Sequence, residues 1–164
     1  MEIRDAIAED AEAACEVLRR SIAELCVADH RNDRQLLTEW LSNKNPDSFR
    51  SWLRPGNSVL VAVEGDAILA VGSVTDAGMI TLNYVSPDAR FRGVSRRLLA
   101  ALEARAIERG NTRCTLHSTE TAHRFYLANG YADTGSAARV FGGTGYPMSK
   151  ALSAEHQTRI TSSS

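Results

Sequence analysis

Cysteine is scarce in this sequence of 164 residues, and its three copies, Cys15, Cys26 and Cys114, are odd in number. No two of them form a Cys-x-x-Cys pair, so the sequence indicates neither a disulfide framework nor a zinc site. We therefore expect no metal, and a reducing cytoplasm is the simplest setting for the protein.

Long apolar runs are also missing. None approaches the roughly 20 residues that a helix needs to cross a bilayer. The first residues, 1–5, carry charge where a signal peptide would need an apolar region. A membrane is therefore not expected as a partner.

Neither sign of charge is in excess, because 19 lysines and arginines oppose 20 acidic residues, for a net charge of −1. Apart from Phe91, no aromatic residue has a basic residue on both sides, so nucleic acid is not expected as a partner either. One stretch departs from this balance, since residues 88–113 hold seven arginines and three acidic residues. We expect a site for a polyanion there rather than over the whole surface.

The chain has 43% hydrophobic residues, four prolines and no internal repeat, which predicts one globular domain over residues 1–152. Residues 153–164 are polar and rich in serine and are predicted to be a tail. Apolar periodicity predicts strands and helices in alternation. The predicted strands are 2–6, 58–63, 67–75, 79–85, 112–117, 131–134 and 146–152. The predicted helices are 8–25, 33–41, 47–53, 94–109 and one that follows Thr119, and 29–34 is predicted to be a polar break.

Residues 84–109 organise the rest of the chain. An extended stretch ends there, turns through a basic glycine loop and becomes an amphipathic helix that begins after Gly93. The free N–H groups of the first helical turn and the positive end of the helix dipole both favour an anion. Arg90, Arg92 and Arg96 add positive charge at the same place. Taken alone, the same pattern is also typical of a simple turn with solvated arginines.

The fuller pattern is more specific. Arg90-x-x-Gly93-x-Ser95, preceded by Val85-x-Pro87, resembles the acyl-CoA-binding signature of the GNAT superfamily of N-acetyltransferases. That signature is usually written Arg/Gln-x-x-Gly-x-Gly/Ala. Ser95 departs from the usual last residue, but it is small enough to leave the backbone close to a pyrophosphate.

A second stretch, residues 119–131, resembles the other GNAT signature, in which a short helix carries Phe-Tyr and ends at Gly followed by an aromatic residue. Thr119 is placed to cap this helix, and Gly130 is placed to end it. Tyr126, the tyrosine of the Phe-Tyr pair, would read as a core residue if it stood alone. The spacing between the two signatures is that of the family.

The resemblance implies an α/β (α+β) GNAT fold, with a mixed and mostly antiparallel sheet flanked by helices. It implies that the strands carrying Val85 and Leu116 splay apart to admit the pantetheine arm of acetyl-CoA, and that a backbone N–H near Tyr84 or Val85 polarises the thioester carbonyl. The co-substrate is then acetyl-CoA, without a metal. The residues that the resemblance and the loop pattern place at this co-substrate are Tyr84, Val85, Arg90, Phe91, Arg92, Gly93, Val94, Ser95, Arg96 and Thr119.

The family mechanism is a direct attack of a neutral amine on the thioester. Tyr126 matches the family tyrosine that protonates the leaving thiolate, and Cys114 is not proposed as a nucleophile. No residue is assigned as the base by sequence, but His117 ends a strand at the cleft, and histidine has an ordinary pKa of about 6.5. A strand-end histidine bonded to solvent is the alternative for His117. Weaker candidates for the base are Asn83, Glu39, Asp29 and His30, and a chain of water molecules can replace a dedicated base.

We expect the acceptor to be a small-molecule amine or a peptide amine, flanked by 29–53 and by the glycine-rich segment 135–147. Trp40 and Trp52 fall in the first of these segments, and their helical spacing favours core positions over a substrate pocket. A second copy of the chain, in a homodimer, is a possible partner. The alternative function is that of a GNAT module that binds acyl-CoA as a sensor or structural subunit without turnover.

Overall fold

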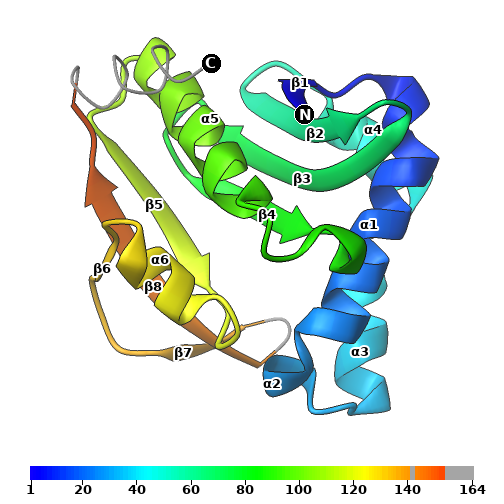
Figure 1. Ribbon diagram of the computed structural model, residues 1–164. Coiled ribbons are helices and arrows are strands. Elements are labelled where there is room, and N and C mark those ends of the chain that lie inside the picture. Colours follow the sequence, from blue (N-terminus) through cyan, green and yellow to red (C-terminus); the bar gives the residue numbers. More distant parts are fainter. Residues whose placement is uncertain (141–142, 154–164) are drawn as a thin grey trace.

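The computed structural model describes residues 1–140 and 143–153. Its first sheet is antiparallel and has the order β1-β2-β3-β4 (Figure 1). The strands are β1 (Glu2–Asp5), β2 (Asn57–Glu64), β3 (Ala67–Thr75) and β4 (Ile80–Val85). The predicted hairpin between the second and third strands is confirmed, with a register that runs from Asn57 opposite Thr75 to Glu64 opposite Ala67.

The second sheet holds β5 (Arg113–Ser118), β8 (Gly143–Ala151) and β6 (Ala132–Asp133), in that order. The predicted pairing of 131–134 with 146–152 is confirmed, because Ala132 lies opposite Ser149. An additional short strand, β7 (Ala138–Val140), also pairs with β8 and was not predicted.

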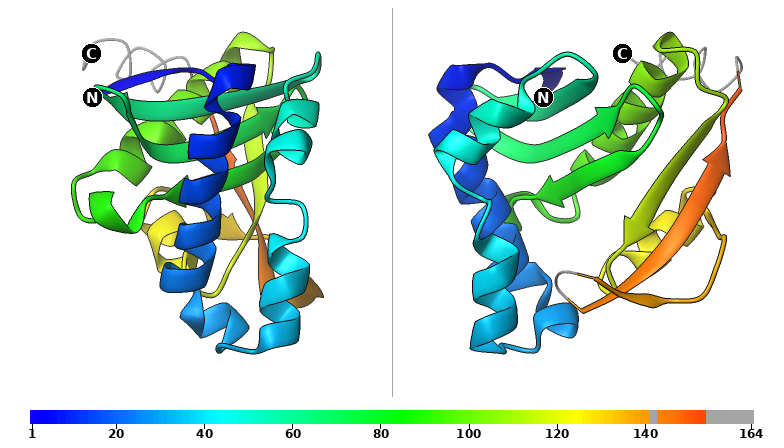
Figure 2. Two further views of the ribbon diagram at one scale, coloured as in Figure 1. Left: turned by 90° about the vertical axis from the view of Figure 1, so that its right-hand side faces the viewer. Right: turned by 180° about the vertical axis from the view of Figure 1, so that it is seen from behind.

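The two sheets meet at one point. Met79, just before β4, forms a parallel bridge with Thr115 of β5, and from there the two strands diverge (Figures 1 and 2). The strands predicted over 79–85 and 112–117 are therefore parallel, as expected, but they pair only at this bridge. The fold class is confirmed as mixed α/β, with antiparallel sheets flanked by helices.

The helices of the first third of the chain are η1 (Ala8–Asp10), α1 (Ala11–Leu25), α2 (Val27–His30), α3 (Arg34–Leu41) and α4 (Pro46–Trp52). The prediction of a polar break over 29–34 was wrong at its start, because α2 includes Asp29 and His30, which are both buried. The chain then reverses through Arg31 and Asn32, which have positive φ angles. Further along lie η2 (Pro87–Ala89), α5 (Val94–Glu108) and α6 (His123–Ala128).

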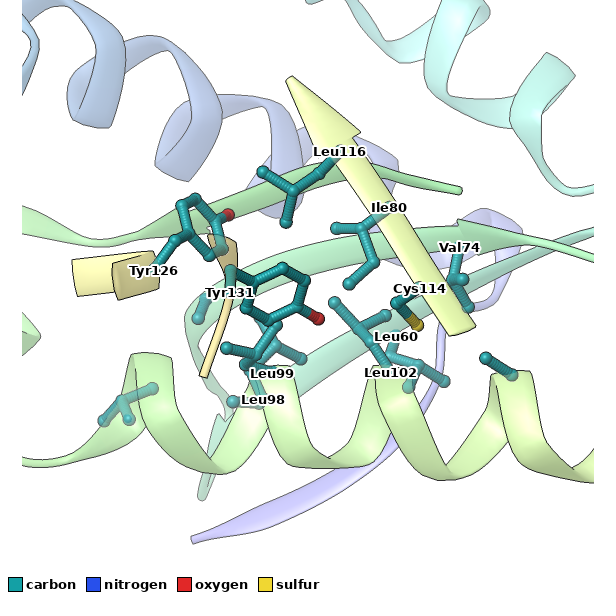
Figure 3. Packing of buried hydrophobic residues seen from close by; sticks show 14 of the residues in the cluster. Leu60, Val74, Ile80, Leu98, Leu99, Leu102, Cys114, Leu116, Tyr126 and Tyr131 are labelled. Carbon is teal, nitrogen blue, oxygen red and sulfur yellow. The ribbon is translucent and has the colours of Figure 1, made fainter. Parts of the chain in front are cut away.

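The first sheet separates two cores because side chains alternate along its strands. Val59, Val61 and Val63 of β2 pack with α1, whereas Leu60 and Ala62 belong to the cluster on the α5 side. Figure 2 shows α1 crossing the face of the sheet that α5 leaves free. Figure 3 shows the α5 side, where the labelled core residues are Leu60, Val74, Ile80, Leu98, Leu99, Leu102, Cys114, Leu116, Tyr126 and Tyr131.

Trp40 packs in the protein interior, and Trp52 is partly buried against the core. Trp40 is buried and packs with Ile22 and Cys26, and the Trp52 ring packs edge-on against Phe49, with ring centroids 5.7 Å apart. Of the predicted tail, all but Ser153 lies outside the described residues, as does part of the glycine-rich segment. No helix in the described part of the chain has the length and apolar character required to cross a bilayer.

Candidate active site

A cavity of about 650 Å³ opens between α1, β4, the basic loop and α6. It is enclosed by elements that are far apart in the sequence, since α1 supplies one wall and α6 another. Its lining residues are Ser21, Leu25, Cys26, Asn83, Tyr84, Val85, Ala89, Arg90, Phe91, Gly93, Val94, Ser95, Arg96, Thr119, Thr121, Ala122, Phe125 and Tyr126. The structure thus brings together every residue that the sequence placed at the co-substrate, except Arg92.

The basic loop ends where α5 begins. Gly93 precedes the helix with φ at +76°, a conformation that glycine adopts without steric cost. No side chain caps the helix at Gly93, so the N–H groups of the first turn are free at the positive end of the dipole, where Gly93, Val94 and Ser95 line the cavity. Val94 is buried and anchors this turn to the core. The site can therefore hold an anion at this end.

Phe91 stands out within the loop. It is 93% exposed, and its φ of +62° lies in the left-handed region that bulky residues rarely adopt. The guanidinium of Arg90 sits 4.6 Å from the centre of its ring. Both side chains line the cavity at its mouth.

Arg92 does not line the cavity. Its guanidinium pairs with the carboxylate of Glu64, the last residue of β2, at 2.7 Å. Here Arg92 therefore faces Glu64 and not the cavity that Arg90 and Arg96 line, and its contact with the co-substrate stays a prediction. The sequence could not show the pair with Glu64, because Glu64 comes near the loop only when β2 and β3 pair.

Strand β4 forms the floor of the cavity through Asn83, Tyr84 and Val85. The N–H of Ser86 donates to the carbonyl of Leu69 on β3. Because the N–H groups of successive residues in a strand point to opposite edges, the N–H of Val85 points away from β3. Of the two residues that the sequence left open as the backbone donor, Val85 has its N–H on the edge that diverges from β5.

Tyr126 lies on α6 and is 6% exposed. Burial raises the pKa of its phenol to about 12, although a hydrogen bond from Asn83 acts in the opposite direction. That bond joins Nδ2 of Asn83 to the phenol oxygen at 3.2 Å. Figure 3 shows the ring beside that of Tyr131, with the ring centroids 5.5 Å apart. The phenol is therefore protonated at neutral pH and is held in a fixed position.

A second, smaller cavity of about 60 Å³ lies between β4 and β5. Asn83, Tyr84, Thr119, Ala122 and Tyr126 line both cavities, so the two spaces share the wall around the phenol. His117 lines only the smaller cavity, and its side chain is exposed. The structure therefore places His117 on the side of Tyr126 away from the basic loop.

Thr119 does not cap α6 directly. The helix begins at His123, and the hydroxyl of Thr119 accepts a hydrogen bond from the N–H of Ala122, one residue earlier. The helix ends near Gly130 as predicted, and Gly130 has a φ of +92°, in the left-handed region that favours glycine. Thr119 instead closes the turn that carries the wall of both cavities.

Two of the weaker candidates for the base are committed to structural bonds. The Asp29 carboxylate accepts hydrogen bonds from the N–H groups of Glu120 and Thr121 and from the Thr121 hydroxyl. His30 is fully buried, with its ring nitrogens bonded to the carbonyl of Ile22 and the N–H of Asn32. The Asp29 bonds tie α2 to the turn before α6, and the His30 bonds tie it to α1 and to the turn at Asn32. Both roles are structural.

Several residues of the cavity escaped the sequence analysis. Ser21 and Leu25 come from the last turns of α1, and Cys26 follows directly; the sequence of α1 is that of an ordinary amphipathic helix. Burial raises the pKa of the Cys26 thiol to about 12 and that of Cys114 to about 11, so both remain thiols. Within residues 1–140 and 143–153, no three His, Cys, Asp or Glu side chains gather as metal ligands would.

Comparison with known proteins identifies the fold. A family model described as an acetyltransferase (GNAT) domain matches residues 23–152. A sequence search of curated proteins finds no match. Among solved structures, one from Rhodopseudomonas palustris, described as a GCN5-related N-acetyltransferase and class-II aminotransferase, is 24% identical with a TM-score of 0.79, over 92% of this chain and 95% of that one.

Two further structures have the same fold. The PaiA N-acetyltransferase of Thermoplasma acidophilum, solved in complex with coenzyme A, is 18% identical with a TM-score of 0.74, over 92% of this chain and 98% of its own. The ribosomal-protein-S18-alanine N-acetyltransferase of Escherichia coli is 18% identical with a TM-score of 0.71, over 93% and 94%. Since the family model also spans most of the sequence, this chain belongs to the GNAT family of acetyltransferases.

Proposed function

We propose that the chain transfers an acetyl group from acetyl-CoA to a primary amine within a ternary complex. The observation that carries the proposal is that one cavity joins the basic loop at the start of α5 to the phenol of Tyr126. An anion site and a protonated acid on the wall of one cavity suit a substrate that has phosphates at one end and a thioester at the other. The PaiA structure, which contains coenzyme A, has the same fold.

In this proposal the residues of the basic loop hold the phosphates. The N–H groups that follow Gly93 supply neutral donors, and Arg90 and Arg96 supply charge. The pantetheine arm then runs along β4, where the N–H of Val85 is available to the thioester carbonyl. Acetyl-CoA contributes the activated acetyl group.

Tyr126 acts as the general acid. As the amine nitrogen bonds to the acetyl carbon and the C–S bond breaks, the phenol gives its proton to the sulfur, and coenzyme A leaves as a thiol. The amine loses one proton to the base in the same reaction. The base releases this proton to solvent, and the phenolate takes one from solvent, which completes the cycle. A phenol with a pKa of about 12 stays protonated throughout the neutral range, so its proton is present when the thiolate leaves.

We propose that the acceptor amine approaches from the side of the smaller cavity, with His117 as the base that takes its proton. His117 and Tyr126 line this space together. The acceptor is a small-molecule amine or a peptide amine. The S18-alanine N-acetyltransferase, which has the same fold, is named for an acceptor of the second kind.

The test is release of the coenzyme A thiol from acetyl-CoA, measured with a thiol reagent in the presence of a panel of polyamines, amino acids, aminoglycosides and peptides. The proposal predicts that at least one amine raises release well above the rate without amine, with a matching acetylated product by mass. A chain that binds acetyl-CoA yet releases no thiol with any amine would instead be the non-catalytic module.

A further inference from the structure

We propose that Asn83 is a positioning residue that directs the proton of Tyr126 toward the leaving sulfur. The inference rests on the proposed function, because it assigns a second residue to the same proton transfer. It begins from a geometric observation. Nδ2 of Asn83 donates a hydrogen bond to the phenol oxygen at 3.2 Å.

The direction of this bond decides what the phenol can do. A phenol oxygen can accept hydrogen bonds and has a single proton to donate. When the amide donates to that oxygen, the phenol proton cannot point back at the amide and is left for another acceptor. In the opposite amide orientation the carbonyl oxygen would take the phenol proton and hold it away from the substrate.

The other end of the amide, its carbonyl oxygen, is where a bound ligand can act. The carbonyl oxygen Oδ1 of Asn83 is buried and has no hydrogen-bond partner in the described part of the protein. A buried polar atom without a partner destabilises a fold, so such an atom in a cavity wall calls for an explanation. Because Asn83 lines both cavities, a ligand in either can supply an N–H donor to Oδ1.

Asn83 is also placed to act on both halves of the reaction. It lies on β4, one residue before Tyr84 and two before Val85, the proposed donor to the thioester carbonyl. The same strand would therefore fix the carbonyl through Val85 and the phenol through Asn83. A bound N–H at Oδ1, from the pantetheine arm or from the acceptor amine, would lock the amide with Nδ2 toward the phenol.

The role differs from that of a base. An amide does not take up a proton at neutral pH, so Asn83 neither accepts nor releases one during the reaction. It holds the phenol in the orientation in which the phenol proton is free to go to the leaving sulfur. Its removal should accordingly lower kcat while leaving the binding of coenzyme A nearly unchanged.

The experiment is a double-mutant cycle of Asn83→Leu with Tyr126→Phe, with kcat measured for the best amine of the panel and the Kd of coenzyme A measured by calorimetry. We expect Asn83→Leu to lower kcat on the order of 10-fold or more in the wild-type background and to have almost no further effect beside Tyr126→Phe. Asn83→Asp, which keeps the size of the side chain and removes the donor, should lose a similar factor. Coenzyme A affinity and melting temperature report whether each variant is folded.

The outcomes separate the alternatives. Asn83→Leu could lower kcat by the same factor in the Tyr126→Phe protein as in wild type. That result would overturn the role, because Asn83 would then act independently of the phenol. Full kcat in Asn83→Asp would overturn the donor assignment, since a carboxylate can only accept from the phenol. A wild-type protein that acetylates no amine would overturn the proposed function itself, and the role of Asn83 with it.

Discussion

The guanidinium of Arg92 lies 2.7 Å from the carboxylate of Glu64, so this arginine is turned toward the end of β2. Arg90, two residues earlier, sits over the ring of Phe91 and lines the large cavity. Both members of the Arg92–Glu64 pair are about half exposed, and an exposed pair of this kind contributes little to stability. The two arginines therefore offer a matched comparison of charge inside and outside the proposed phosphate site.

The first prediction uses this comparison. Arg90→Glu should weaken coenzyme A binding on the order of 10-fold or more, because it puts a negative charge where the phosphates are proposed to lie. Arg92→Glu introduces the same charge change outside the cavity and should weaken binding much less. The measurement is the rise in melting temperature with coenzyme A, at fixed ionic strength, in wild type and both variants. Equal losses in the two variants would mean that a general field attracts the ligand, not a local site.

The second prediction concerns the close approach of β3 and α5. A Cβ on Gly72 would lie 2.9 Å from Cδ1 of Leu102 and 3.1 Å from Cδ2 of Leu98. Gly72→Ala should therefore lower the free energy of unfolding by about 1–3 kcal/mol, as overpacking of a core does. The check is denaturant unfolding. Gly135→Ala serves as the control, because a Cβ there meets only Pro147, at 3.5 Å, and should be nearly neutral. A neutral Gly72→Ala would show that the leucines move aside at no cost.

The third prediction concerns Lys44, which is 7% exposed and donates to Oδ1 of Asn43 at 2.6 Å. Burial lowers the pKa of its amine from 10.5 to about 8. Between these values the unfolded chain binds a proton that the native chain has released, so this group makes stability rise with pH there. Below pH 8 both states are protonated, and the cost of burying the charge is present in full.

Lys44→Met should therefore raise the free energy of unfolding below pH 8, by at most about 3 kcal/mol. The gain should shrink as the pH rises from 8 toward 10.5. Urea unfolding of both proteins at pH 7 and pH 10 checks this, because all other titrating groups are common to the two. A gain that is equal at both pH values would contradict a lowered pKa for Lys44.

Much of the fold could be predicted from periodicity. The residues from Val94 onward form one apolar stripe at helical spacing, which predicts α5. Apolar, β-branched residues on either side of Gly65 predict the hairpin of β2 and β3. The separate sheets could not be predicted in this way. Their divergence depends on β4 and β5 pairing only at Met79 and Thr115, a tertiary outcome that no local pattern encodes.

The residues of the candidate site also differ in whether a local pattern or a tertiary contact reveals them. Gly93 and Tyr126 belong to local signatures and were named from sequence, and the structure places both on one cavity. Asn83 was considered only as a weak base, because its bond to Tyr126 spans 43 positions of the chain. Asp29 was likewise misread as part of a polar break. Its partners at residues 120–121 are visible only once α2 docks on the turn before α6.

The central claim is that the phenol of Tyr126 is the acid of an acetyl transfer. Tyr126→Phe retains the ring and its packing against Tyr131 and removes only the hydroxyl. The direct measurement is the rate of acetyl transfer to the best amine, together with the Kd of coenzyme A, in wild type and Tyr126→Phe. We expect the rate to fall on the order of 10²-fold in Tyr126→Phe, with little change in Kd. Equal rates in the two proteins would contradict it and leave Tyr126 as a core residue.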